Sequence, residues 1–157
     1  MEYILKTKYG NIGIQANSKG ISRLMLNVKL SRNKSKRQLD KNLKRLIGQL
    51  NQYFQGKKVD FSIMLDTDKF SNFYQKVWTQ ARKIPYGKTT TYGEIARKIG
   101  HPKASRAVGR ALGANPIAIV IPCHRVIRKD KSLAGFAYGL KWKKTLLKIE
   151  NISAGKH

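Results

Sequence analysis

The spacing of apolar residues changes near residue 68, and this change most constrains the fold. Before it, apolar residues occur in short runs that alternate with polar ones, as at 3–8 and 21–28, which is typical of β-strands. After it, apolar residues recur every three or four positions, which is typical of helices. A chain of 157 residues suffices for one domain or two small ones. We therefore expect an α+β protein with domains at residues 1–68 and 69–157.

The first segment predicts a small α/β domain with an antiparallel sheet. A hairpin is expected with its turn at Gly10-Asn11, followed by a strand at 21–28 and a basic loop at 29–41. Apolar residues from Leu39 to Phe54 at helical spacing predict a helix, and alternation at 59–65 predicts a strand. This segment contains no recognisable chemical motif.

The second segment predicts a mostly helical domain. Helices are expected at 70–81, 92–99, 104–114 and 141–150, with a buried strand or extended segment at 117–121. The second and third of these helices are short and joined by Gly100-His101-Pro102, which makes a helix-turn-helix of winged-helix type a candidate. Alone this signal is weak, because many helical hairpins do not bind DNA.

Charge strengthens the case for DNA. The chain holds 33 Lys and Arg against 8 Asp and Glu, a formal net charge of +25. Residues 1–68 carry 14 basic and 5 acidic side chains, and residues 69–157 carry 19 and 3. Such an excess favours a polyanion through phosphate neutralisation and counterion release, and solubility alone does not require it. We expect the second segment to provide most of the nucleic-acid surface.

Other features limit the remaining classes of protein. No apolar run approaches the roughly 20 residues that span a bilayer, and no signal peptide or lipidation signal is apparent, so we expect a cytoplasmic protein without membrane contact. One cysteine excludes an internal disulfide, and the three histidines lack metal-ligand spacing, so no metal site is expected.

The single cysteine, Cys123, follows an apolar run and precedes His124-Arg125. A lone cysteine in this position is often a small core residue. Adjacent cations, however, are expected to lower the pKa of its thiol and so favour the nucleophilic thiolate. Glu150 is one of three acids in this half of the chain and is a candidate to orient His124 as a base. Both readings of the cysteine remain open on this evidence.

A longer pattern surrounds this cysteine. Ile121-Pro122-Cys123-His124-Arg125-Val126, with Asn115-Pro116 upstream, resembles the active-site signature of the O6-alkylguanine-DNA alkyltransferases. The resemblance covers about residues 70–150 and includes Tyr92-Gly93-Glu94-Ile95-Ala96, Ser105-Arg106-Ala107-Val108-Gly109 and Gly135-Phe136-Ala137-Tyr138-Gly139. It implies repair of DNA carrying O6-alkylguanine, with O4-alkylthymine as a possible second substrate. The alkyl group would pass irreversibly to the protein without a cofactor.

The resemblance also implies roles for individual residues. Cys123 would accept the alkyl group, His124 would take its proton through a water, and Glu150 would hold the histidine. Tyr92 would contact the flipped nucleotide and help to twist the neighbouring phosphate, and Lys143 matches a lysine near the active site. Arg106 would fill the gap in the base stack, while Ser105, Ala107 and Gly109 would lie in the minor groove. Asn115, Val126, Phe136 and Ala137 would form the substrate pocket.

The chain also departs from some relatives. Its first segment lacks the residues for the zinc site that some members carry, and Phe136 stands where some have tyrosine. Ser105 and Arg110 stand where some relatives have smaller residues, so the contact with the groove is expected to differ in detail. Related proteins that bind such lesions without repairing them lack the acceptor cysteine, so Cys123 separates the two possibilities. A helix-turn-helix regulator and a thiol hydrolase are further alternatives. We expect a monomer, with cooperative clustering on DNA left open.

Overall fold

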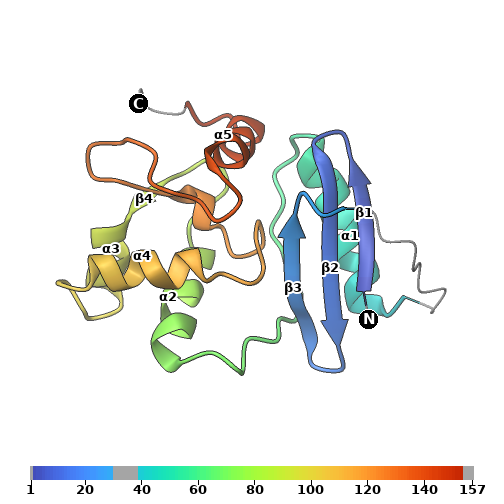
Figure 1. Ribbon diagram of the computed structural model, residues 1–157, viewed down its shortest axis with the longest axis horizontal. Helices are drawn as coiled ribbons and strands as arrows, with labels where there is room; N and C mark the ends of the chain where they lie inside the picture. The colour runs from blue at the N-terminus through green and yellow to red at the C-terminus, as the bar shows by residue number, and fades with distance from the viewer. Residues whose placement is uncertain (1, 30–38, 154–157) are drawn as a thin grey trace. The chain divides into compact units, whose positions relative to one another are not determined.

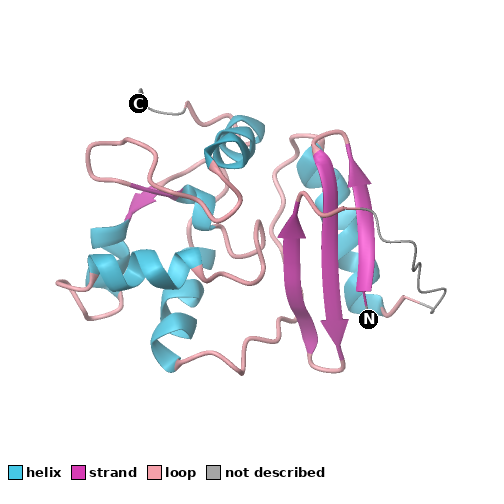
Figure 2. Ribbon diagram, viewed as in Figure 1, coloured by secondary structure: helices cyan, strands magenta, loops and turns pink. Residues whose placement is uncertain are grey.

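The computed structural model describes residues 2–29 and 39–153 and confirms the α+β class (Figures 1 and 2). It comprises two compact units, Met1–Thr67 with Pro116–Ala118, and Asp68–Asn115 with Ile119–His157. The first unit contains β1 (Glu2–Thr7), β2 (Gly10–Asn17), β3 (Gly20–Leu26) and α1 (Lys41–Phe54). The second contains α2 (Asn72–Arg82), β4 (Thr90–Thr91), α3 (Tyr92–Lys98), α4 (Ser105–Gly113), the 3-10 helix η1 (Cys123–Arg125), β5 (Val126–Ile127) and α5 (Leu140–Ile149).

The sheet of the first unit is antiparallel in the order β1-β2-β3, and α1 lies along one of its faces (Figure 1). The register pairs Leu5 with Ile12 and Ile12 with Leu26, so alternate apolar side chains share one face. That face is buried, as are Leu43, Leu46 and Leu50 of α1. The packed sheet and helix thus follow from period-2 and helical spacing in the sequence.

Two predicted boundaries in this unit are wrong by a few residues. The first hairpin turns at residues 8–9 rather than at Gly10-Asn11, because the Thr7 hydroxyl donates to Gly10 O (2.7 Å) and accepts from Tyr9 N (3.1 Å). Helix α1 begins after Asp40, whose carboxylate caps Leu43 N at 2.8 Å, so Leu39 precedes the helix. Residues 30–38 of the predicted basic loop lie outside the described residues.

The strand predicted at 59–65 is not a regular strand. Its side chains do alternate, since Val59, Phe61 and Ile63 are buried and their neighbours exposed. Several of its backbone groups, however, are bonded by side chains of α1: Asn42 bonds Met64 N (3.0 Å) and Met64 O (3.1 Å), and Arg45 and Gln49 donate to two further carbonyls. Beside β3, Ile21 N donates to Met64 O (2.9 Å) and Asp66 N to Ile21 O (2.8 Å). Helix side chains therefore take the place of a partner strand.

The second unit contains the predicted helix-turn-helix, formed by α3 and α4. Thr91 caps α3 in a reciprocal capping box with Glu94. The helices pack on α2, where the Trp78 indole donates to Ala111 O at 2.8 Å across a buried contact. Val77, Ala81, Val108 and Ala111 are fully buried. The buried side of α4 is therefore packed closely, and this packing fixes the position of the residues on its exposed side.

The apolar run 117–121 is buried as predicted, but it is not a strand. Leu24 N donates to Pro116 O (2.9 Å) and Ala118 N to Leu24 O (3.2 Å), so residues 116–118 pair with β3 of the first unit. The chain then turns at Ile119, whose φ is +70°. A β-branched residue is strained there. Ile119 is the residue at which the run passes from the first unit to the second.

One pairing was not predicted. Strands β4 and β5 are parallel, with Thr90 opposite Val126 and Thr91 opposite Ile127. Two residues each are too few for a visible alternation in the sequence. The pair connects the start of α3 to the segment that follows Cys123.

None of the helices in the described ranges is long and apolar enough to cross a membrane.

Gly20 offers a test of this packing. Its φ is +147°, and a Cβ there would lie 2.6 Å from Met64 O, so Gly20→Ala is strained and collides with backbone. We expect it to lower the free energy of unfolding by roughly 2 kcal/mol or more in urea denaturation. Gly48→Ala is the matched control, because a Cβ at this position of α1 meets nothing within 4 Å. It should stabilise the protein by up to about 1 kcal/mol. Similar effects of the two changes would contradict this account.

Candidate functional site

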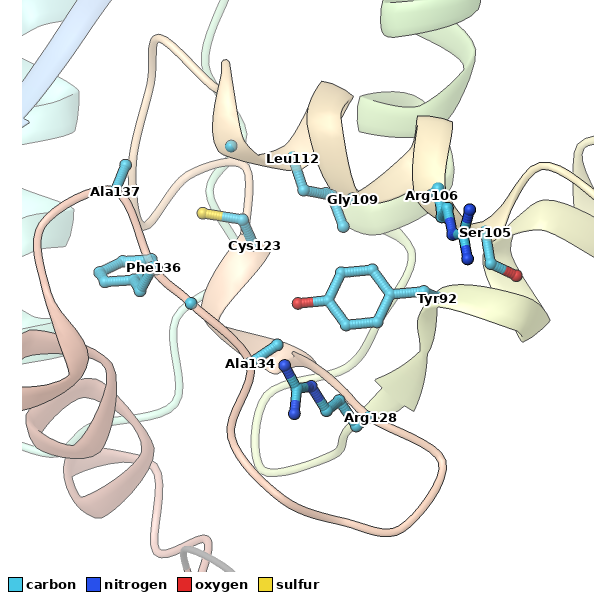
Figure 3. A pocket seen from close by; sticks show the side chains of 12 residues that line it. Tyr92, Ser105, Arg106, Gly109, Leu112, Cys123, Arg128, Ala134, Phe136 and Ala137 are labelled. Atoms are coloured by element: carbon cyan, nitrogen blue, oxygen red, sulfur yellow. The ribbon is translucent and has the colours of Figure 1, made fainter. Parts of the chain in front are cut away.

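A cavity of about 580 Å³ opens on the second unit, and Cys123 lies in its wall (Figure 3). The lining comes from the start of α3, one side of α4, η1, the end of β5 and the loop before α5: Tyr92, Ser105, Arg106, Gly109, Leu112, Gly113, Cys123, Arg128, Ala134, Gly135, Phe136 and Ala137. The helix-turn-helix and the cysteine therefore share one pocket.

Asn115 positions the thiol. Its Nδ2 donates to Ile121 O at 2.8 Å and to Cys123 Sγ at 3.1 Å. The side chain of Asn115 is itself buried. Since Asn115 follows directly on the α4 cap at Ala114, the end of α4 is tied to the backbone before Cys123 and to the sulfur itself.

The environment of Cys123 corrects one prediction. Only 8% of the residue is exposed, and this burial raises the pKa of the thiol above its ordinary value. The Asn115 hydrogen bond and the charge of Lys143 oppose the rise without cancelling it. Neither neighbouring cation acts as expected, because the side chains of His124 and Arg125 both turn toward Glu150. At neutral pH the sulfur is therefore a thiol and needs a base.

Glu150 is the centre of a buried cluster. Its Oε1 accepts from Arg125 Nη2 (3.1 Å) and bonds His124 Nε2 (2.6 Å), while Oε2 accepts from Arg125 Nε (2.9 Å) and Gly87 N (3.2 Å). The residue caps the C-terminus of α5 and is 2% exposed. Burial alone would raise the pKa of Glu150, but the hydrogen bonds of His124 and Arg125 and the charge of Arg125 outweigh burial and lower this pKa to about 2. Glu150 is a carboxylate under all ordinary conditions.

His124 is fully buried, and its protonation follows from these contacts. Burial, with the charges of Arg125 and Lys143, lowers the pKa of the imidazole, against the opposing effect of Glu150. The ring is therefore neutral at pH 7. A neutral ring beside a carboxylate places its proton on Nε2, the atom that faces Glu150, which makes Nδ1 the basic nitrogen.

Arg125 belongs to the site, but its partner differs from the one expected from the sequence. Its guanidinium bonds Glu150 and does not act on the Cys123 thiol. Besides its two bonds to Glu150, its Nη1 donates to Ile84 O at 2.6 Å, and its guanidinium lies 5.9 Å from the centre of the Tyr86 ring. A planar guanidinium is suited to such a forked, buried contact. The sequence around Cys123 does not indicate these contacts of Arg125, because the two partners lie 25 and 41 positions away along the chain.

Lys143 lies behind the pocket wall rather than in it. Its Nζ donates to Val126 O (2.8 Å) and Ala134 O (3.4 Å), which joins β5 to the loop before α5. Burial lowers the pKa of Lys143 to about 8, with a smaller contribution from the charge of Arg128. Val126 is itself fully buried, and its N–H bonds Cys123 O.

Tyr92 projects into the cavity with its hydroxyl directed toward the side that holds Cys123 (Figure 3). Burial raises the pKa of this hydroxyl, and charge at Cys123 raises it further, so it remains protonated and can donate. Arg106 is exposed on the first turn of α4, beside Ser105. Phe136 and Ala137 form part of the opposite wall (Figure 3).

The structure thus gathers most of the predicted residues around one cavity. Tyr92, Ser105, Arg106, Gly109, Cys123, Phe136 and Ala137 line it, whereas His124, Glu150, Lys143, Asn115 and Val126 lie behind it, and Ala107 lies on α4 outside the lining. Arg128 and Ala134 line the cavity and were not predicted. Within residues 2–29 and 39–153, no group of three or more His, Cys, Asp or Glu side chains could hold a metal ion.

Comparison with known proteins gives the family. Residues 72–152 match the model described as "6-O-methylguanine DNA methyltransferase, DNA binding domain", and residues 2–67 match "6-O-methylguanine DNA methyltransferase, ribonuclease-like domain". The chain belongs to this family. The recognition made from the motif around Cys123 is thereby confirmed.

Individual relatives agree with the family models. The methylated-DNA–protein-cysteine methyltransferase of Methanosarcina acetivorans is 52% identical over 102 residues, 65% of this chain and 65% of the relative. That of Haemophilus influenzae is 48% identical over 100 residues, 64% of this chain and 56% of the relative. These alignments span less than two thirds of the length of the curated relatives.

Solved structures align over nearly the whole chain. The crystal structure of Mycobacterium tuberculosis OGT in complex with DNA has a TM-score of 0.82 and 36% identity, and the match covers 96% of this chain and 92% of the other. An O6-methylguanine DNA methyltransferase from Methanococcus jannaschii has a TM-score of 0.70 and 29% identity, with 99% and 96% covered. Both units of the present chain therefore have counterparts in solved members of the family.

The low pKa of Glu150 predicts a dependence of stability on pH. A carboxyl with a folded pKa below its unfolded value stabilises the protein above the unfolded pKa, and this contribution is lost as pH falls toward the folded pKa. From an ordinary value near 4.3 to about 2, the loss amounts to about 3 kcal/mol between pH 5 and pH 2. Glu150→Gln should lack this part of the acid dependence in urea denaturation at several pH values.

The control is Asp60→Asn, which changes an exposed carboxyl of the first unit in the same isosteric way and is measured over the same pH range. At pH 7, Glu150→Gln should also be destabilised by roughly 3–5 kcal/mol, because it leaves the Arg125 charge buried and unneutralised. An acid dependence equal to that of wild type in Glu150→Gln would show that the carboxylate does not have a depressed pKa.

Proposed function

We propose that this protein repairs DNA by direct reversal: it takes the alkyl group from an O6-alkylguanine onto Cys123, once per molecule. The observation that carries the proposal is a thiol in a pocket of this size, backed by a neutral histidine and a carboxylate, in a member of this family. The names of its relatives, methylated-DNA–protein-cysteine methyltransferases, support the same chemistry.

The proposed transfer is a simple displacement. The Cys123 thiol gives its proton to His124 Nδ1 through a water, and the thiolate attacks the alkyl carbon. A C–S bond forms as the C–O6 bond breaks, and the electron pair passes to the guanine, which regains a proton and leaves as the normal base. The proton lost by sulfur and the one gained by guanine balance, so no cofactor is required.

The charges of the cluster suit this role. The raised pKa of the Cys123 thiol makes a base necessary, and the lowered pKa of His124 keeps its imidazole able to accept. Once His124 is protonated, the Glu150 carboxylate at 2.6 Å stabilises it. The Tyr92 hydroxyl, which remains protonated, can donate toward the base as charge develops on it. Lys143 keeps the Cys123 side and the loop side of the pocket together.

Access to the pocket requires that the damaged nucleotide leave the duplex. The O6 atom lies inside the stack, so the base must be flipped out, at a cost of a few kcal/mol. Arg106 on α4 would fill the gap, and Ser105, Ala107 and Gly109 would let this helix approach the minor groove. The net charge of +25 supplies a sequence-independent attraction for the duplex. Phe136 and Ala137 would contact the flipped base within the pocket, and Asn115 and Val126 would support the pocket from behind its lining.

The product is a thioether, and nothing in this site provides for its hydrolysis. A protein that only binds lesions would not need the acceptor sulfur, and a thiol hydrolase would need to turn over. We further propose that the protein acts as a monomer in the cytoplasm, and that O4-alkylthymine and cooperative clustering on DNA are the first extensions to examine.

The direct test is the mass of the intact protein. After incubation with a duplex oligonucleotide that carries one O6-methylguanine, we expect a gain of one methyl group, mapped to Cys123 by peptide mass spectrometry. Cys123→Ala should gain nothing while still binding the duplex. A wild-type protein that binds the lesion tightly but keeps its mass would instead be a lesion-binding module.

Arg106→Ala separates DNA handling from chemistry. Because its side chain is exposed on α4 and makes no contribution to the His124–Glu150 cluster, reaction with a free alkylated base such as O6-benzylguanine should proceed as in wild type. Repair of the duplex should be slower by about tenfold or more, since part of the cost of flipping is no longer recovered. Equal losses on both substrates would contradict the proposed role.

A further inference from the structure

Arg128 has a place in the pocket that the proposed chemistry does not use. The parallel pairing of β4 and β5 sets Thr91 opposite Ile127. The residues that follow these two, Tyr92 and Arg128, therefore lie side by side. Both line the cavity (Figure 3). Arg106, on α4, lies on the other side of Tyr92 in this view (Figure 3). Two arginines from different elements thus flank the tyrosine.

The backbone at Arg128 is held independently of its side chain. Arg128 N donates to Ser132 O (3.2 Å), and Lys131 N donates to Arg128 O (2.9 Å), with Lys131 at a φ of +64°. Asp130 Oδ1 bonds both the backbone N and the hydroxyl of Ser132, at 2.9 and 2.6 Å. The tight turn therefore fixes the Cα of Arg128 while its guanidinium remains exposed.

The charge of Arg128 is available and acts on the pocket. Hydrogen bonds from Ser132 to Asp130 Oδ1 lower the pKa of the Asp130 carboxyl on the same turn, and the charge of Arg128 helps to lower it. Within the part of the chain that the structure describes, the Asp130 and Arg128 side chains do not form an ion pair. Burial lowers the pKa of Lys143, and the charge of Arg128 adds to this effect. Burial raises the pKa of Tyr92, and the charge of Arg128 opposes that rise. The Arg128 guanidinium is thus close enough to the cavity to influence both Tyr92, in the cavity lining, and Lys143, behind it.

We propose that Arg128 binds a phosphate of the DNA backbone next to the nucleotide that enters the pocket. The inference rests on the proposed function, because it takes the flipped nucleotide as given. A nucleotide turned into the cavity brings its own phosphates to the rim, and an exposed guanidinium beside Tyr92 can bind two phosphate oxygens at once. Arg106 would then act on the base stack and Arg128 on the backbone of the same nucleotide.

The position of Arg128 favours a phosphate over the alkyl group itself. The alkyl carbon must lie against Cys123 Sγ, whose residue is only 8% exposed, whereas Arg128 is exposed and follows the end of β5. An arginine could also attract an anionic adduct such as a carboxymethyl group on O6. The two ligands predict different substrate dependence, which makes them separable by experiment.

The test compares Arg128→Ala with Arg128→Lys and with Lys129→Ala. Lys129 is the matched control, because it is an exposed cation on the same turn. Both residues line a neighbouring cavity, but Arg128 also lines the cavity that holds Cys123, and Lys129 is not part of that lining. Arg128→Ala should repair an O6-methylguanine duplex about tenfold more slowly. The loss with free O6-benzylguanine should be clearly smaller than the loss with the duplex, since the free base has no phosphate. Arg128→Lys should recover part of the loss, and Lys129→Ala should stay closer to wild type than Arg128→Ala.

Binding provides a second readout that does not depend on transfer. In the Cys123→Ala background the lesion persists, and the slope of log Kd against log salt should become shallower by about 0.9 for each phosphate contact removed. An unchanged slope for Arg128→Ala would overturn the proposal, as would equal losses on duplex and free base. A loss confined to O6-carboxymethylguanine would show instead that Arg128 reads an anionic adduct. Failure of the proposed function would give a different result, because the wild-type protein would then gain no alkyl group from either the duplex or the free base.

Discussion

The buried carboxylate of Glu150 is the interaction on which the rest of the site depends. A buried carboxylate, here only 2% exposed, must be compensated by hydrogen-bond donors, and Glu150 receives them from the backbone of Gly87 and from the side chains of His124 and Arg125 in η1. These bonds attach the end of α5 to η1 and so fix the short helical turn that holds the sulfur. They also set the orientation and the tautomer of His124. One carboxylate thus determines both the local backbone and the acid–base state of the site.

As a result, the sulfur of Cys123 is uncharged before substrate binds. A thiol of raised pKa and a neutral imidazole coexist behind the pocket, and neither is charged at pH 7. Oxidation and adventitious alkylation both follow thiolate character and exposure, so a buried thiol is protected from them. This matters for a protein whose acceptor would be consumed in one reaction. Reactivity would then arise when the flipped base occupies the pocket and brings the electrophilic carbon to the sulfur.

The parallel pair β4–β5 connects the two halves of the function. β4 leads directly into Tyr92 and the helix-turn-helix, and β5 follows directly on the cysteine turn. Asn115 makes a second connection, from the end of α4 to the sulfur. The elements that would hold DNA and the group that would react are therefore positioned by shared hydrogen bonds. Contacts made along α4 or at Arg128 can therefore be expected to align the nucleotide with the thiol.

The sequence by itself determined the α+β class, the helices and the family, because these follow from local periodicity, capping residues and a motif contiguous along the chain. It also named Cys123, His124, Glu150, Tyr92 and Arg106, which the structure brings to one site. Only the tertiary structure decided that the Arg125 guanidinium turns to Glu150, that the thiol pKa rises, and that Arg128 stands beside Tyr92. The physical reason is the same in each case. Side-chain direction, burial and the pairing of two-residue strands depend on groups tens of positions away, and no local pattern records them.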